Sequence, residues 1–384
     1  MYRVIIIFSF AVAVALTCLL QIDTAPAQTI PPSLLQGGSE SAIKDRKNGW
    51  TVGIVGGLID GTYMRFADEL AKVLDDGDNL RIMPIVSYGA ASNLEDLIYL
   101  RGVDLAVTQS DVFEYFRTER KTPDLQKRIN YILRLPIAEL HILAKTDIQS
   151  IEDLRGKKVN FGPAGSGSSL TGTIVFQRLG INVEQVLIDQ QSGLQKLQSG
   201  ELAALVRVVG KPVDFFNRIP PNSGLHLVPI PFTKVFADYY TVGEFEAKDY
   251  PSLIAEGQTV NTIAVPAVLA VFNWPRGSDR YRRIERFAER LFSKWDQFQI
   301  APRHPKWREV NLGATVPGWN RHTLAEQMLA RFHGPSAALQ GDISSDFQAF
   351  LNRAGTGAPQ SQTEREALFR QFMQWREQQG GPRR

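Results

Sequence analysis

Short β-branched runs alternate with helical patterns in the first half of the chain, and this alternation limits the folds open to it. Strands are expected at residues 50–55, 80–87 and 103–108, because each run is short and bounded by turn residues. The helical patterns YMRFADELAKVL and NLEDLIYLRG lie between them. Strand–helix–strand alternation predicts parallel strands joined by right-handed crossovers, and so an α/β fold.

Two long apolar stretches indicate a second lobe. RINYILRLPIAELHILAK, at 128–145, contains Pro136, which would break it as a helix, and NTIAVPAVLAVFNW, at 261–274, also contains a proline. We expect the first stretch to be two extended segments that leave one sheet and enter another, and the second stretch to be extended as well. A second α/β series lies between them, and a chain of 384 residues is long for one domain. These features predict two α/β lobes joined by a two-stranded hinge.

This organisation sets the expected boundaries. They are a signal peptide at 1–27, a flexible leader at 28–48, lobe 1 at 49–138 with 262–345, lobe 2 at 139–261, and a helical C-terminal extension at 346–384. The basic run RGSDRYRRIERFAER starts the helical region after 278. Ile284, Phe287, Leu291 and Trp295 have helical spacing, which predicts a buried stripe flanked by solvated arginines.

The first residues indicate export to the periplasm. Arg3 precedes the apolar run VIIIFSFAVAVALTCLL, and Ala25-Pro26-Ala27 is a small-residue cleavage site that leaves Gln28 as the mature N-terminus. An uncleaved membrane anchor is the alternative, but the run is near the lower length limit for spanning a bilayer.

Composition excludes several kinds of site. The single cysteine, Cys18, lies in the signal peptide and follows Thr17, a poor match to a lipoprotein box, so the mature chain has no thiol chemistry and no disulfide. No histidines have the spacing of a metal pair, and we predict neither metal nor cofactor. A net charge of +3, without an aromatic and basic platform, argues against a nucleic-acid partner.

Two glycine-rich loops are the candidate binding elements. GGLIDGTYMR, at 56–65, lacks the lysine of a P-loop and the spacing of a dinucleotide fingerprint. Its glycines can still bring N–H groups to an anion at a helix N-terminus, with Thr62 as cap and Tyr63 as phenolic donor. The alternative is a plain turn capped by Asp60 or Thr62. GPAGSGSSLTG, at 162–172, repeats the design with three serines, and the two loops would converge on one anion if the lobes face each other.

Three further segments are expected to face the same site. SYGAASN, at 87–93, offers Ser87 and Tyr88, with Asn93 as a helix cap, and TQSDVF, at 108–113, ends a strand, where open α/β sheets bind ligands. Asp111 there either holds an ammonium group or caps the next helix. Arg207 either clamps a carboxylate with two hydrogen bonds or is a surface cation.

We find no catalytic residues. The serine of GPAGSGSS is not in a G-x-S-x-G elbow, and no general base is recognisable beside it. A transferase acting on a phosphorylated substrate would require a lysine in the first loop, a base or metal ligands.

The segments VGGLIDGTYMRFADELAKVL, IVSYGAASNLEDLIYLRGVDLAVTQSDV and GKPVDF resemble the TAXI-type solute-binding proteins of TRAP transporters, over roughly residues 50–275. The resemblance implies a periplasmic binding protein fold that closes on a small anionic solute, a glutamate-like compound or dicarboxylate, and delivers it to a TRAP-type membrane permease. The loop Leu58-Ile59-Asp60 departs from the family's small-residue run, which bears on the identity of the ligand. A sensing protein that reports to a membrane receptor is the alternative that the sequence leaves open.

The residue analysis and the resemblance together give one set of candidate ligand contacts. They are Gly57, Gly61, Thr62, Tyr63, Ser87, Tyr88, Gln109, Ser110, Asp111, Gly165, Ser166, Gly167, Ser168, Ser169 and Arg207.

Overall fold

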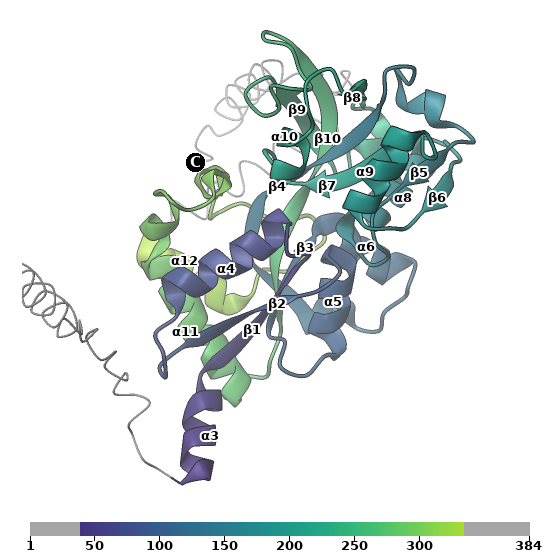
Figure 1. Ribbon diagram of the computed structural model, residues 1–384. Coiled ribbons are helices and arrows are strands. Elements are labelled where there is room, and N and C mark those ends of the chain that lie inside the picture. Colours follow the sequence, from purple (N-terminus) through teal and green to yellow (C-terminus); the bar gives the residue numbers. More distant parts are fainter. Residues whose placement is uncertain (1–38, 334–384) are drawn as a thin grey trace, which may run out of the picture. The chain divides into compact units, whose positions relative to one another are not determined.

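A ten-stranded sheet runs through the part of the chain that the computed structural model describes, residues 39–333 (Figure 1). Its hydrogen-bonded order is β2-β1-β3-β10-β4-β7-β5-β6, with β8 paired to β4 and β9 paired to β10. The strands are β1 (Thr51–Gly57), β2 (Arg81–Val86), β3 (Leu105–Gln109), β4 (Ile129–Lys145), β5 (Lys158–Asn160), β6 (Glu184–Val186), β7 (Ala204–Val209), β8 (Leu225–Leu227), β9 (Thr241–Glu246) and β10 (Thr259–Phe272).

Helices connect most of these strands. The α-helices are α3 (Glu40–Gly49), α4 (Thr62–Leu74), α5 (Ala90–Tyr99), α6 (Ser110–Thr118), α7 (Leu125–Arg128), α8 (Gly167–Arg178), α9 (Gln190–Ser199), α10 (Asp214–Asn217), α11 (Asp279–Ser293) and α12 (Thr323–His333). Short 3₁₀ turns are η1 (Ile151–Leu154), η2 (Lys234–Phe236), η3 (Trp295–Phe298) and η4 (Pro305–Glu309).

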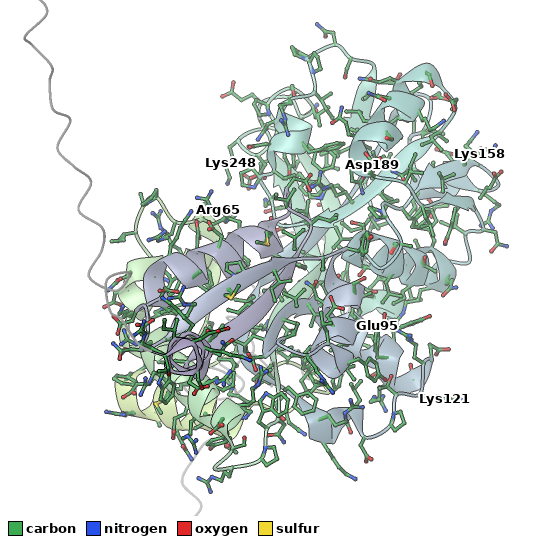
Figure 2. The ribbon with its side chains drawn as sticks, turned by 60° about the horizontal axis from the view of Figure 1, so that its bottom comes forward. Arg65, Glu95, Lys121, Lys158, Asp189 and Lys248 are labelled. Carbon is green, nitrogen blue, oxygen red and sulfur yellow. The ribbon has the colours of Figure 1, made fainter. Side chains whose placement is uncertain are left out.

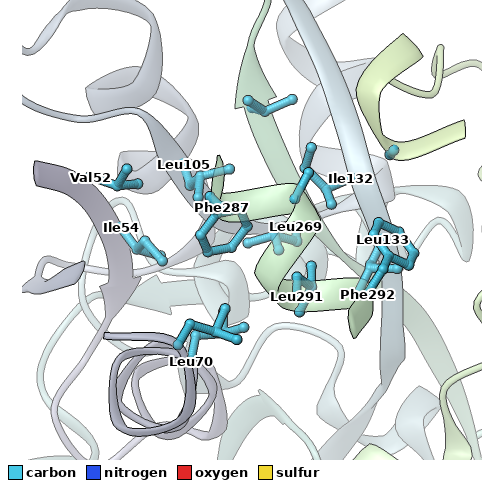
Figure 3. Close-up of a cluster of buried hydrophobic side chains, with 14 of the residues drawn as sticks. Val52, Ile54, Leu70, Leu105, Ile132, Leu133, Leu269, Phe287, Leu291 and Phe292 are labelled. Carbon is cyan, nitrogen blue, oxygen red and sulfur yellow. The ribbon is translucent and has the colours of Figure 1, made fainter. Parts of the chain in front are cut away.

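Lobe 1 is built on the parallel strands β2, β1 and β3, with β10 antiparallel to β3. Helix α4 buries Phe66, Leu70 and Val73, which lie on one face because they are three or four residues apart. Figure 3 shows how Leu70 from α4 and Phe287 and Leu291 from α11 meet the inward side chains of the sheet. The helical stripe predicted in the basic run is therefore confirmed, with Ile284 and Trp295 also buried.

Lobe 2 repeats the design on β6, β5 and β7, which are mutually parallel in that order, and on the crossing strand β4, which is antiparallel to β7. Its helix α8 packs on the sheet through Val175 and Phe176, against Phe161 and Val206. In both lobes, therefore, a glycine-rich turn leads from a strand to a helix that covers the sheet.

Two long strands, β4 and β10, cross from one lobe to the other and pair antiparallel with each other. The prediction of two separate extended segments at 128–145 is wrong, because β4 is a single strand of one continuous sheet, whereas the prediction that 261–274 is extended is confirmed by β10. The prolines are accommodated where the register shifts: Pro266 pairs with Ile137, and the ladder is irregular before Val268 pairs with Arg134. A bulge there removes the need for the N–H groups that proline lacks.

The two α/β lobes with a two-stranded connection confirm the predicted fold class, that of a two-lobed periplasmic binding protein. The lobe limits at 138/139 and 261/262 stay a prediction. The signal peptide and the extension at 346–384 lie outside the described residues.

Residues 39–47 belong to a separate unit of the chain. A flexible leader was expected at 28–48, and within it the structure has the helix α3, which begins at Glu40 and buries no residue. The Ser39 hydroxyl accepts a hydrogen bond from the N–H of Ala42, and Glu40 and Lys47 have the charges that each helix end favours.

Charged side chains lie at the periphery of both lobes, as the labelled Arg65, Glu95, Lys158 and Lys248 show in Figure 2. None of the helices within residues 39–333 has both the length and the hydropathy that crossing a membrane requires.

Candidate functional site

A pocket lies between the lobes at the carboxyl ends of β1 and β7, where α4 and α8 begin. Its cavity volume is about 50 Å³, several times the space that one water molecule needs. Its lining comes from both lobes: Gly56, Gly57, Leu58, Gly61, Thr62, Tyr63, Tyr88, Gly89, Ala90, Ser166, Gly167, Ser168, Gln190, Arg207, Val208 and Val209.

The first loop presents the N-terminus of α4 to this pocket. Gly61 is the extended residue before the helix, and no side chain caps the helix. The hydroxyl of Thr62 donates instead to the carbonyl of Gly210 in lobe 2, at 3.2 Å. The predictions that Thr62 or Asp60 caps this helix are therefore wrong, because Thr62 is inside the helix and both side chains reach lobe 2.

The second loop supplies the N-terminus of α8. Ser166 caps this helix by accepting a hydrogen bond from the N–H of Ser169, and the Ser169 hydroxyl donates back to the Ser166 carbonyl. The Ser168 hydroxyl accepts from the N–H of Val208, at 2.9 Å. Two of the three serines line the pocket, whereas Ser169 serves the turn.

Glycines allow the two lobes to approach each other closely. Gly89 has a φ of +125°, and a Cβ there would lie 3.0 Å from the Cα of Ser166 across the pocket. A Cβ on Gly167 would lie 2.1 Å from Oε1 of Gln109. Nearby, the N–H of Ser92 donates to the carbonyl of Gly165, at 3.0 Å, so the lobes are joined by a backbone hydrogen bond.

Arg207 is the charged side chain of the pocket wall. It projects from β7, is only 3% exposed, and its guanidinium stacks over Phe215 at 4.8 Å. One nitrogen, Nη2, donates to Oδ2 of Asp60 at 2.8 Å, while Nη1 has no hydrogen-bond partner among the described residues. The alternative of a surface cation is therefore excluded.

Several buried polar atoms around the pocket have no hydrogen-bond partner in the described part of the chain. They are the Tyr63 hydroxyl, both amide atoms of Gln109, the Ser110 hydroxyl, Oδ1 of Asp111, Oε1 of Gln190 and Nη1 of Arg207. Buried polar groups are nearly always paired, so a group of unpaired ones at one pocket indicates a polar ligand. Burial also raises the pKa of Tyr63 well above its usual value, and the charges of Asp111 and Glu139 add to this effect, so its hydroxyl keeps its proton.

Asp111 joins the lobes behind the pocket. It lies in the first turn of α6, and its Oδ2 accepts from Thr171 at 2.7 Å and from Tyr240 at 3.0 Å, both in lobe 2. Burial raises the pKa of this carboxyl group. The prediction that Asp111 caps the helix is wrong, because the carboxylate turns to the other lobe. Asp111 is also absent from the pocket lining, where an ammonium group would have to lie.

A second buried carboxylate lies at the connection between the lobes. Glu139 of β4 forms an ion pair with Lys306 at 2.8 Å, and both side chains are 2% exposed. Its other oxygen accepts from the N–H of Lys211, the residue after the Gly210 that Thr62 contacts. Burial raises the pKa of Glu139, although Lys306 opposes the shift.

The structure brings together nine of the fifteen predicted contacts in the pocket lining: Gly57, Gly61, Thr62, Tyr63, Tyr88, Ser166, Gly167, Ser168 and Arg207. Ser87, Gln109, Ser110, Asp111, Gly165 and Ser169 lie outside the lining. Ser87 supports it through Asn93, which accepts the Ser87 hydrogen bond and donates to the Val107 carbonyl. The prediction that Asn93 caps a helix is wrong, because α5 begins at Ala90 and encloses it.

Seven lining residues were not predicted: Gly56, Leu58, Gly89, Ala90, Gln190, Val208 and Val209. Gly56, Leu58, Gly89 and Ala90 lie within loops that the sequence singles out. Gln190 has a detectable signal, because it directly follows Asp189, which accepts a hydrogen bond from the N–H of Ser192 and caps α9.

The lining residues do not form a recognisable acid–base centre. The lining includes Ser166 and Ser168 but no histidine, cysteine or carboxylate, and no cluster of potential metal ligands occurs among residues 39–333. The absence of enzymatic activity stays a prediction.

Comparisons with known proteins give one family match and several distant structural likenesses. A model of the NMT1-like family matches residues 54–317. One similar solved structure is an amino acid ABC transporter substrate-binding protein from Streptococcus pneumoniae bound to L-arginine, with 16% identity over 70% of this chain and 98% of that one and a TM-score of 0.38. Another is a cysteine-binding protein from Campylobacter jejuni, with 17% identity over 70% of this chain and 92% of that one and a TM-score of 0.37. A third is the GluR0 ligand-binding core from Nostoc punctiforme in complex with L-glutamate, with 14% identity over 74% of this chain and 100% of that one and a TM-score of 0.36. These likenesses are distant, and the fold assignment rests on the strands and helices of this chain itself.

Proposed function

The chain belongs to the NMT1-like family, and from its pocket we propose that it is a periplasmic solute receptor that binds a small carboxylate between its lobes and delivers it to a TRAP-type membrane permease. One observation carries the proposal. The guanidinium of Arg207 is buried in the pocket wall with Nη1 unpartnered, beside the N-termini of α4 and α8. A buried guanidinium and two helix N-termini together favour a carboxylate.

The mechanism follows from the division of the pocket between the lobes. Thr62 and Tyr63 come from lobe 1, whereas Ser168 and Arg207 come from lobe 2. A ligand that contacts both sets gains its full binding energy only when the lobes touch, so binding favours the closed arrangement. The permease then recognises the closed receptor, and opening releases the solute.

Calorimetry and thermal melting of the purified protein test the proposal against amino acids, dicarboxylates, 2-oxoacids and phosphate esters. A carboxylate at a hundredfold excess over its Kd should stabilise the folded protein by about 3 kcal/mol. Arg207→Gln should weaken its binding by roughly 10- to 150-fold, the equivalent of one hydrogen bond to a charged group.

Arg155→Gln is the matched control, because Arg155 is also a lobe 2 arginine but donates to the Gly180 carbonyl at the surface. It should bind like the unchanged protein. Binding of phosphate esters but of no carboxylate would overturn the proposal. For delivery, solute uptake by reconstituted permease should require the receptor, and uptake that is independent of it would contradict this part.

A further inference from the structure

The charge of the pocket wall restricts the class of ligand. Arg207 is the only charged side chain among the described residues that line the pocket. Lys306 and Lys211 lie nearby, but Lys306 is paired with Glu139 and Lys211 with Asp249, at 2.8 Å in each case. The positive charge available to a ligand is therefore that of one guanidinium.

Asp60 already uses part of that guanidinium. Its Oδ2 accepts from Nη2 of Arg207 at 2.8 Å, although the Asp60 side chain is half exposed, at 52%. Arg207 could otherwise offer two parallel hydrogen bonds to a carboxylate. Asp60 thus takes one N–H of Nη2 and offsets part of the positive charge, while Nη1 has no hydrogen-bond partner among the described residues. Asp60 belongs to the Leu58-Ile59-Asp60 segment, so the feature that sets this first loop apart also acts on the arginine.

Most of the other unpaired polar groups around the pocket are neutral. Oε1 of Gln190, the Tyr63 hydroxyl and the Gln109 amide lack partners and can each form a hydrogen bond with an uncharged group. Asp111 and Glu139 are further negative charges, close enough to Tyr63 to raise its pKa. A second ligand carboxylate would thus be enclosed without a counter-charge and close to two acidic side chains, which is strongly unfavourable.

Resting on the proposed carboxylate-receptor function, we infer that the ligand carries a single carboxylate, bound by Nη1 of Arg207, and that its other end is an uncharged hydrogen-bonding group such as an amide or hydroxyl. Asp60 is the specificity-determining residue, because its carboxylate accepts from Nη2 and offsets the positive charge that a second ligand carboxylate would need.

Matched ligand pairs test this inference by calorimetry at about pH 8, where both carboxylates of a dicarboxylate are ionised. Glutamine is compared with glutamate, and succinamate with succinate, because each pair differs only in an amide that replaces a carboxylate. The amide of each pair should bind at least about tenfold more tightly, since an amide is far less costly to enclose than an unpaired carboxylate. Asp60→Asn should narrow this difference in affinity by several fold, because it removes the negative charge that offsets that of Arg207.

Asp68→Asn is the control, since it removes the same charge from a side chain that only pairs with Lys72 on the surface of α4. It should leave the difference in affinity between the amide and the dicarboxylate of each pair unchanged. If the dicarboxylate of each pair binds as tightly as its amide or more tightly, the inference fails while the proposed function stands. If the amides bind more tightly but Asp60→Asn leaves this difference in affinity unchanged, the role of Asp60 is refuted. If none of the four ligands and no other carboxylate binds, the proposed function fails, and the inference with it.

Discussion

Replacing Gly167 by alanine tests whether binding requires the two lobes to touch. Gly167 is the first residue of α8, and its added Cβ would lie 2.1 Å from Oε1 and 2.9 Å from Cδ of Gln109 in lobe 1. Ordinary van der Waals contacts are longer by about an ångström. Gln109 is fully buried, so it can relieve the overlap only by holding the lobes apart or by turning into the space that the ligand needs.

Either response weakens binding. Overpacking of this kind costs about 1–3 kcal/mol, which corresponds to a Kd about 5- to 150-fold higher. The ligand-free protein can open and avoid the overlap, and alanine at a helical position adds up to about 1 kcal/mol of stability. The expected result is a higher Kd by calorimetry together with an unchanged or slightly raised melting temperature.

Gly172→Ala, in the same helix, is the comparison. Its Cβ would lie 2.6 Å from Phe161 and 3.1 Å from Val206, both within lobe 2, so opening of the lobes gives no relief and the melting temperature should fall. If Gly167→Ala lowers the melting temperature as Gly172→Ala does, or leaves Kd unchanged, then the argument from lobe closure is refuted.

Three further predictions concern the hinge, the buried histidine and export. Lys306→Met leaves Glu139 buried without its partner and should lower the free energy of unfolding by about 3–5 kcal/mol in denaturant titrations. Adding Glu139→Gln to this variant should restore part of the loss. Equal losses in the single and the double variant would contradict this. Burial lowers the pKa of His141 to about 3, so its contribution to stability is complete above about pH 6.5 and is lost as pH falls from there, by up to about 1.4 kcal/mol per pH unit. His141→Gln should therefore show a shallower decline of the free energy of unfolding in urea titrations at successive pH values. An identical decline in both proteins would refute this reasoning. Mass spectrometry of the exported protein should find Gln28 as its first residue, and an intact N-terminus would favour the membrane anchor instead.

The sequence predicted the elements of the fold well, because each depends on local patterns. The strand–helix alternation and the prolines in two long apolar stretches were sufficient for two lobes and a shared hinge. The continuity of β4 was not predictable, because it depends on a register shift opposite β10 that accommodates Pro136 and Pro266.

The site was predicted less completely, because its contacts join distant residues. Arg207 and Asp60 are 147 positions apart, and Tyr240 and Asp111 are 129 apart. The sequence indicated that Arg207 and Asp111 end strands or begin helices, but not which partners they meet across the pocket. Helix capping, the local alternative for Asp111, gave way to this long-range contact.

Hydrogen exchange with and without a bound carboxylate tests the central claim, that the ligand lies between the lobes and holds them together. The amide of Ser92 donates to Gly165 across the lobes, and that of Val208 donates to Ser168 beside the pocket. Ligand should slow exchange in peptides covering 56–66, 87–94, 162–172 and 206–211, and these peptides come from both lobes. Protection confined to one lobe, or to segments away from the pocket, while calorimetry records binding, would contradict the account.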